Sequence, residues 1–168
     1  NHRKILVVDG HTGFLGGVNI ADRYYYGNEL GEWHDTHMKV TGETVASLQT
    51  SFFMDRYFIL NRKIRRRKKY YPHPDIEKIG AEQTGRKIAV QTVASGPDSN
   101  WSSIMQCFFS AITLARKHIY IVSPYFTPNE SILNAIKIAA LGNIDVRIML
   151  PDKSDTLLAH YSTMSYVS

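Results

Sequence analysis

The last third of the chain carries the pattern that most restricts its fold, because two apolar segments flank one helical segment. Residues 119–122 and 144–150 are short runs rich in Ile and Val, which is typical of buried strands. A capping box that begins at Thr127, with Pro128 at the first helical position, predicts a helix start, and Gly-Asn at 142–143 predicts its end. Strands joined through a helix pair in parallel with a right-handed crossover. The chain is therefore expected to have an α/β fold.

The first half of the chain predicts a small sheet followed by a helix. Residues 4–9 and 12–16 read as two strands around a turn at Gly10-His11, and residues 35–41 read as a further extended run. Apolar residues at three- and four-residue spacing predict a helix over residues 43–63.

The second half alternates between strand and helix patterns. We expect a strand over residues 88–93, a core-facing helix over residues 101–118, and a last helix capped by Ser154. The predicted organisation is a first lobe at 1–60, a basic linker at 61–87, and a second lobe at 88–168 that is truncated.

Composition is that of a folded chain with a concentrated positive charge. Of its 168 residues, 43% are hydrophobic and 21% charged, and the single cysteine excludes an internal disulfide framework. The net charge of +5 is concentrated in a basic run that suits an anionic lipid surface or a nucleic acid, unless it is only a solvated linker. The basic run consists of Arg62, Lys63, Arg65, Arg66, Arg67, Lys68 and Lys69.

The first strand begins with a histidine and a lysine that share one side. His2 and Lys4 are two residues apart, and side chains of an extended strand alternate with period two. Asp9 lies at an odd separation from His2 and would face the other way. A neutral imidazole is a nucleophile near physiological pH, and a neighbouring lysine can bind the oxygens of a phosphate that it attacks.

Further residues fit a phosphoryl-transfer site. Gly16 and Gly17 allow close backbone approach, and the Asn19 amide can donate to a phosphate oxygen. Attack by His2 would leave a covalent phosphohistidine whose other ring nitrogen needs a carboxylate to fix its tautomer. Glu29, Glu32 and Asp35 lie in the loop after Asn19 and are the candidates; Asp35 is our choice, with Glu29 as the alternative.

The spacing His2-x-Lys4-x4-Asp9-x6-Gly16-Gly17-x-Asn19 resembles the HKD motif of the phospholipase D superfamily. Five further segments narrow the resemblance to bacterial cardiolipin synthases. They are GVNI at 17–20, WHDTH at 33–37, SGPD at 95–98, SPYF at 123–126 and DVRIMLP at 145–151.

The resemblance implies phospholipase D-like lobes with a mixed sheet flanked by helices, two HKD motifs, and no metal or cofactor. It implies transfer of a phosphatidyl group from one phosphatidylglycerol to another, giving cardiolipin and glycerol. By the same resemblance, Asp9 is a structural acid and Asp35 orients the histidine. No second His-x-Lys-x4-Asp occurs in the chain, so we expect the fragment alone to be inactive.

The resemblance also implies a location and leaves alternatives open. We expect the parent protein in the bacterial inner membrane with upstream membrane segments, the fragment itself soluble, and the basic run on lipid rather than on nucleic acid. One alternative is a hydrolase of the same superfamily, a phospholipase D or a nuclease, in which water replaces the lipid alcohol. The other is a non-catalytic module that binds anionic lipid or nucleic acid.

Overall fold

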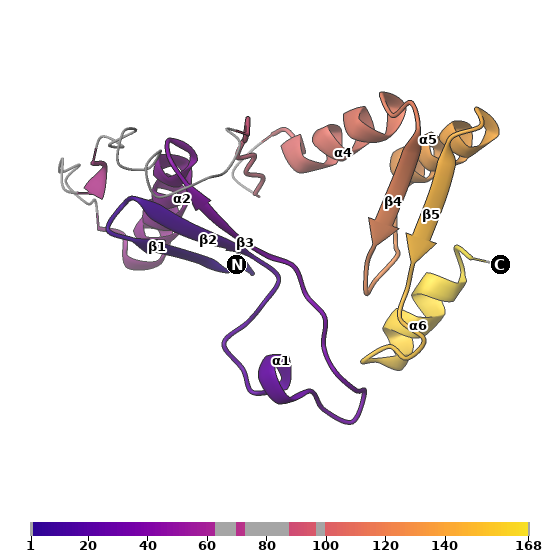
Figure 1. The fold of residues 1–168 in the computed structure, drawn as a ribbon, viewed down its shortest axis with the longest axis horizontal. Coiled ribbons are helices and arrows are strands. Elements are labelled where there is room, and N and C mark those ends of the chain that lie inside the picture. Colours follow the sequence, from indigo (N-terminus) through magenta and orange to yellow (C-terminus); the bar gives the residue numbers. More distant parts are fainter. Residues whose placement is uncertain (1, 63–69, 73–87, 97–99, 168) are drawn as a thin grey trace. The chain divides into compact units, whose positions relative to one another are not determined.

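A computed structural model describes residues 2–62, 70–72, 88–96 and 100–167 of the chain (Figure 1). It confirms the expected α/β class, since helices pack on two small sheets. The chain divides into two compact units, Asn1–Thr92 and Val93–Ser168, each described by itself below.

The first unit contains a three-stranded antiparallel sheet in the order β1-β2-β3. Its strands are β1 (Ile5–Val8), β2 (Thr12–Gly16) and β3 (His37–Thr41), close to the predicted segments. Leu6 pairs with Phe14, which in turn pairs with Lys39, so these three side chains share one face.

The hairpin between β1 and β2 turns one residue earlier than predicted. Asp9 and Gly10 both have left-handed φ angles, 52° and 71°, and the His11 N–H donates to the Val8 carbonyl at 3.1 Å. Aspartate and glycine are the residues that most readily adopt such angles, which explains why the turn centres on them.

Helix α2 (Thr44–Leu60) packs on one face of this sheet. Val45 and Leu48 are its buried residues, and a β-carbon on Gly13 of β2 would lie only 2.7 Å from Leu48 Cδ1. Glycine at position 13 therefore lets the helix lie close to the strand. The helix ends at Leu60, three residues before the predicted end, because the C-cap residue Asn61 has a left-handed φ of 48°.

A long connection, residues 17–36, joins β2 to β3 and carries the short helix α1 (Arg23–Tyr26). Figure 1 shows α1 at the far end of this connection, away from the three strands. The sequence predicts no helix here, because one helical turn leaves no recognisable periodicity.

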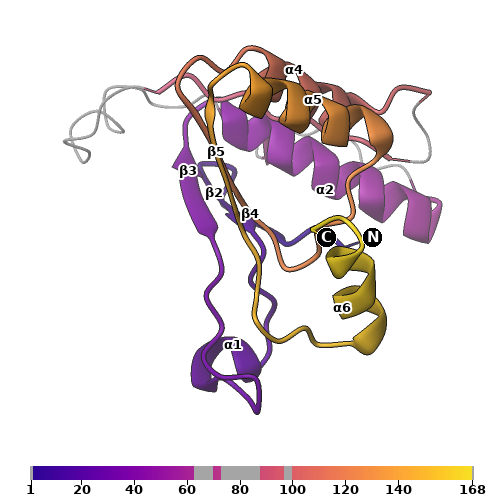
Figure 2. The ribbon, with the colours of Figure 1, turned by 90° about the vertical axis from the view of Figure 1, so that its right-hand side faces the viewer.

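The second unit contains the predicted β-α-β arrangement, with one helix before it and another after it. Strands β4 (His118–Val122) and β5 (Asp145–Met149) pair in parallel, confirming that prediction. Helix α4 (Ser103–Thr113) and helix α5 (Glu130–Leu141) lie side by side (Figure 2). The buried core residues come from both helices and from the segment after β4; they are Ile112, Phe126, Ala135 and Ile136.

Two predicted helix caps were wrong. The N-cap of α5 is Asn129 rather than Thr127, since the extended Asn129 accepts a hydrogen bond from the Ile132 N–H at 2.9 Å. The last helix, α6 (Leu157–Met164), is capped by Thr156 rather than Ser154 through its bond from the Ala159 N–H.

Two element predictions in the second half also need correction. The helix expected over residues 101–118 ends at Thr113, because His118 already pairs with Asp145 at the start of β4. The strand expected over residues 88–93 does not form; Thr92 instead hydrogen-bonds the Thr44 hydroxyl of α2 at 2.9 Å. Across the described ranges, no helix is both long and apolar enough to cross a bilayer.

Candidate active site

His2 and Lys4 meet at the start of β1, as their spacing predicted. The Lys4 Nζ lies 2.5 Å from His2 Nδ1, 3.3 Å from Nε2, and 2.7 Å from the His2 carbonyl oxygen. An ammonium group only donates, so the ring nitrogen beside it is the acceptor in this contact. A neutral imidazole with a cation beside it is the pair that attack on a phosphodiester requires.

The residue between them points the other way. Arg3 forms an ion pair with Asp55 of α2 at 2.5 Å, so its side chain lies on the helix-covered face. By alternation, His2 and Lys4 belong to the opposite face, with Leu6, Val8 and Phe14. Leu6 is 58% exposed and Val8 44%, which shows that this face is open within the described residues.

Asp9 occupies the left-handed turn after β1. Its carboxylate is exposed and makes no hydrogen bond or ion pair within the described part of the chain. The structure thus places Asp9 away from a direct contact with His2 or Lys4, and its role as a structural acid stays a prediction.

Gly16 and Gly17 are closely approached by the protein itself. The Gly17 N–H donates to the Thr36 carbonyl at 3.1 Å, and a β-carbon on Gly16 would lie 2.6 Å from the His37 Cα. A β-carbon on Gly17 would overlap the Asp35 carboxylate, only 2.6 Å from its Cγ. We expected these glycines to let a phosphate approach the backbone. On this side, residues 35–37, which lead into β3, occupy that position instead.

The Asn19 amide is held by an aromatic side chain. Its Nδ2 donates to the Tyr24 hydroxyl of α1 at 2.8 Å. An asparagine amide has two N–H groups, so one remains to donate to a ligand oxygen. The predicted role of Asn19 is compatible with this geometry.

The acid that orients His2 stays a prediction. Asp35 accepts a hydrogen bond from the Thr36 N–H at 2.7 Å and packs against Gly17. In the described ranges, the His2 ring bonds to Lys4 and to no carboxylate. Glu29 and Glu32, the other two candidate acids, therefore also make no contact with the His2 ring in these ranges.

Sequence reasoning missed a polar cluster on the exposed face of the second unit. The Tyr120 hydroxyl donates to Asp145 at 2.8 Å, and the Arg147 Nε donates to the same carboxylate at 3.0 Å. The bond from Arg147, together with that from Tyr120, lowers the pKa of Asp145, while the bond to Asp145 raises the pKa of Tyr120. His118 stacks on Tyr120 with ring centroids 4.7 Å apart. The period-two pattern of polar residues in both strands was the signal that could have revealed it.

The basic run lies outside the described residues except for Arg62. Among the groups that the structure describes, no three His, Cys, Asp or Glu side chains are placed to hold a metal ion.

Comparisons with known proteins agree with the pattern read from the sequence. Residues 108–168 match the family model described as cardiolipin synthase, PLD-like domain. The cardiolipin synthase of Geobacillus thermodenitrificans is 43% identical over 167 residues, which cover 99% of this chain and 32% of that protein.

Two further relatives match in the same way. Cardiolipin synthase 2 of Bacillus cereus is 41% identical over 99% of this chain and 31% of its own length. For the cardiolipin synthase of Halalkalibacterium halodurans, the identity is 44%, over 99% of this chain and 32% of the relative. The chain spans about a third of the length of the curated relatives it matches. Nearly the whole chain is thus similar to one third of these cardiolipin synthases, and residues 108–168 match a PLD-like domain of that family.

Proposed function

We propose that the protein carrying this chain transfers a phosphatidyl group between two phosphatidylglycerol molecules, with His2 as the nucleophile. The observation that carries the proposal is the contact between His2 and Lys4, in a chain 40–44% identical to proteins named cardiolipin synthase. A nucleophile alone would serve many reactions, whereas the paired ammonium suits an anionic phosphodiester.

In the first step, a ring nitrogen of His2 forms a bond to phosphorus and the phosphorus–oxygen bond to glycerol breaks. The leaving glycerol takes a proton from a general acid, which the family resemblance assigns to a second histidine motif. Lys4 binds the phosphoryl oxygens, on which negative charge accumulates, and Asn19 donates its remaining amide N–H to one of them.

In the second step, a hydroxyl of another phosphatidylglycerol attacks the phosphohistidine and the bond between nitrogen and phosphorus breaks. The hydroxyl gives its proton to the same group that protonated glycerol in the first step, and this group now acts as the general base. Dividing the displacement into two steps is what a covalent nucleophile contributes. Asp35 is our proposed partner for the second nitrogen of His2, with Glu29 and Glu32 as the other candidates.

The test is to give the full-length protein phosphatidylglycerol alone and resolve the lipid products. Cardiolipin and glycerol in equal amounts are expected, and His2→Ala should abolish both. Phosphatidic acid without cardiolipin would assign the site to a hydrolase instead, with water as the acceptor. Replacing Asp35, Glu29 and Glu32 in turn by the corresponding amide should identify the orienting acid as the variant with the largest loss of kcat.

We further propose that the protein meets an anionic lipid surface through the basic run. Its support is charge alone, since seven of the eight residues 62–69 are basic. Binding to vesicles that contain phosphatidylglycerol should weaken with added salt and with reversal of Arg65, Arg66 and Arg67 to Glu. Unchanged binding by that variant would contradict this part of the proposal.

A further inference from the structure

We propose that Tyr24 is a positioning residue that fixes the amide of Asn19 for phosphate binding. This inference rests on the proposed function, because it assigns Asn19 to the site. The observation behind it is the bond from Asn19 Nδ2 to the Tyr24 hydroxyl at 2.8 Å. An asparagine whose amide can rotate presents either an N–H or a carbonyl oxygen to an anion, and only the N–H binds it. In the observed contact the Tyr24 hydroxyl accepts from Nδ2, which holds the amide with its second N–H available.

Tyr24 is itself held from two sides. Its ring packs edge-to-face against Trp33, with ring centroids 5.2 Å apart and planes at 69°. The Arg23 guanidinium lies over both rings, 5.6 Å from the centre of Tyr24 and 5.3 Å from that of Trp33. Such contacts restrict the orientation of the Tyr24 ring.

Trp33 is anchored in turn to a tight turn of the same loop. Its Nε1–H donates to the Asn28 Oδ1 at 2.9 Å, and the Leu30 N–H donates to the same oxygen at 3.0 Å. The Asn28 and Gly31 backbones exchange two hydrogen bonds, at 3.0 and 2.9 Å. A chain of contacts thus runs from this turn through Trp33 and Tyr24 to Asn19.

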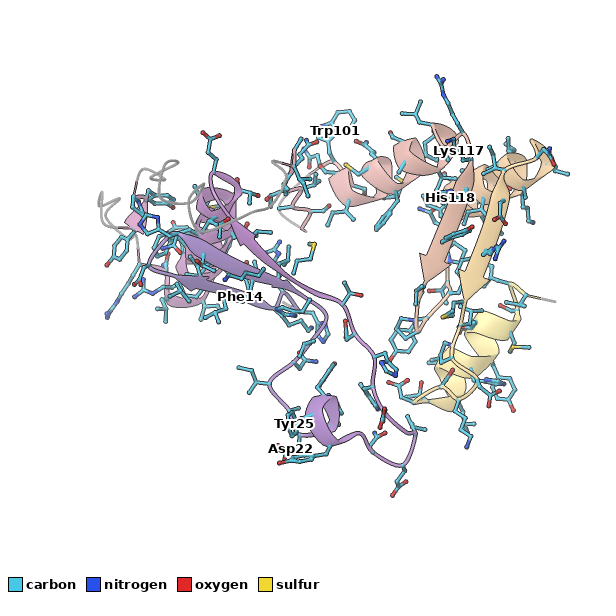
Figure 3. All side chains as sticks on the ribbon, in the orientation of Figure 1. Phe14, Asp22, Tyr25, Trp101, Lys117 and His118 are labelled. Carbon is cyan, nitrogen blue, oxygen red and sulfur yellow. The ribbon has the colours of Figure 1, made fainter. Side chains whose placement is uncertain are left out.

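The next two tyrosines provide matched controls. Tyr25 and Tyr26 belong to the same helical turn but are 84% and 77% exposed, and their recorded ring contact is with each other. Figure 3 shows Tyr25 on α1. Removing the hydroxyl of Tyr25 therefore changes the same atom in the same helix without touching Asn19.

The experiment measures cardiolipin formation by the full-length protein and its Tyr24→Phe, Tyr25→Phe, Asn19→Ala and Tyr24→Phe/Asn19→Ala variants. Loss of one modest hydrogen bond predicts a three- to tenfold lower kcat for Tyr24→Phe, about 10²–10³-fold lower for Asn19→Ala, and no change for Tyr25→Phe. Because Tyr24 acts through Asn19, the double variant should equal Asn19→Ala. The variant Trp33→Phe, which keeps a ring but loses the bond to Asn28, should show a smaller loss of kcat that also vanishes without Asn19.

Two outcomes would overturn the inference while leaving the proposed function intact. One is an active Tyr24→Phe variant with unchanged kcat. The other is a Tyr24→Phe effect that multiplies with that of Asn19→Ala, since a merely structural role would lower both backgrounds equally. A wild-type protein that forms no cardiolipin would instead reject the proposed function itself, so the two failures are distinguishable.

Discussion

Replacing Gly17 by alanine should disturb the close contact between Gly17, directly after β2, and Asp35, which precedes β3. The new methyl group would overlap the Asp35 carboxylate, 2.6 Å from its Cγ and 2.5 Å from Oδ2. Real β-carbons do not approach atoms so closely, so Asp35 or the backbone must move. Overpacking of this kind costs about 1–3 kcal/mol, and alanine returns about 0.4–1 kcal/mol by restricting the unfolded chain.

With both effects near the middle of their ranges, the expected net effect of Gly17→Ala is a loss of about 1.3 kcal/mol in the free energy of unfolding. Thermal unfolding followed by circular dichroism should show it, at about 2–4 °C per kcal/mol for a chain of this size. Gly142→Ala is the matched control, because Gly142 has an ordinary φ of −78° and its nearest neighbours would lie at 3.3 and 3.4 Å. That variant should unfold at nearly the wild-type temperature.

A double-mutant cycle tests the cause. Asp35→Ala alone should cost about 1 kcal/mol, since it removes the acceptor of the Thr36 N–H. In the Asp35→Ala background, however, Gly17→Ala should cost much less, because the group that it overlaps is gone. Equal costs of Gly17→Ala in both backgrounds, or a Gly17→Ala variant as stable as wild type, would refute the reasoning.

Three other predictions concern stability and titration. Asn129→Ala should lower the free energy of unfolding by about 1 kcal/mol, whereas Thr127→Ala should leave it nearly unchanged; chemical denaturation of both variants distinguishes the two caps. Leu48→Ala should cost about 2–5 kcal/mol in the same assay, because Leu48 is only 2% exposed between α2 and the sheet. Arg147→Leu should raise the pKa of Asp145 toward its ordinary value of 3.8, measured by NMR titration of the carboxyl carbon. The pKa of Asp145 is lowered in the folded chain, so its contribution to stability is present above the unfolded pKa. That contribution is lost as the pH falls through the folded pKa. Arg147→Leu should therefore make stability less sensitive to acid.

Period-two and helical spacing were enough to predict most elements. The strand alternation correctly placed His2 beside Lys4, and the β-α-β pattern gave the parallel pairing of the second unit. These features depend on neighbours in sequence, which the sequence displays directly.

Features that need a partner strand or one particular backbone conformation were harder to predict from the sequence. Residues 88–93 have strand-like composition, but a strand also needs a neighbour, and no described strand lies beside them. The cap of α5 was misplaced because Thr127 and Asn129 both have capping side chains, and only the backbone conformation selects between them. The bond from Asn19 to Tyr24 joins residues only five apart, but it lies where the chain has neither a strand nor a long helix, so no periodic pattern predicts it.

The order of the strands also has a consequence for how the site is assembled during folding. The β1–β2 hairpin closes through a tight turn at Asp9-Gly10 and can form on the microsecond scale, which brings His2 and Lys4 into place early. Residues 17–36 form a much longer loop, which must close before β3 pairs with β2. Only after this pairing does Asp35 pack against Gly17. We therefore expect the nucleophile to be formed before its proposed acidic partner, so that a slowly folding chain would pass through a state with His2 and Lys4 paired and Asp35 still free.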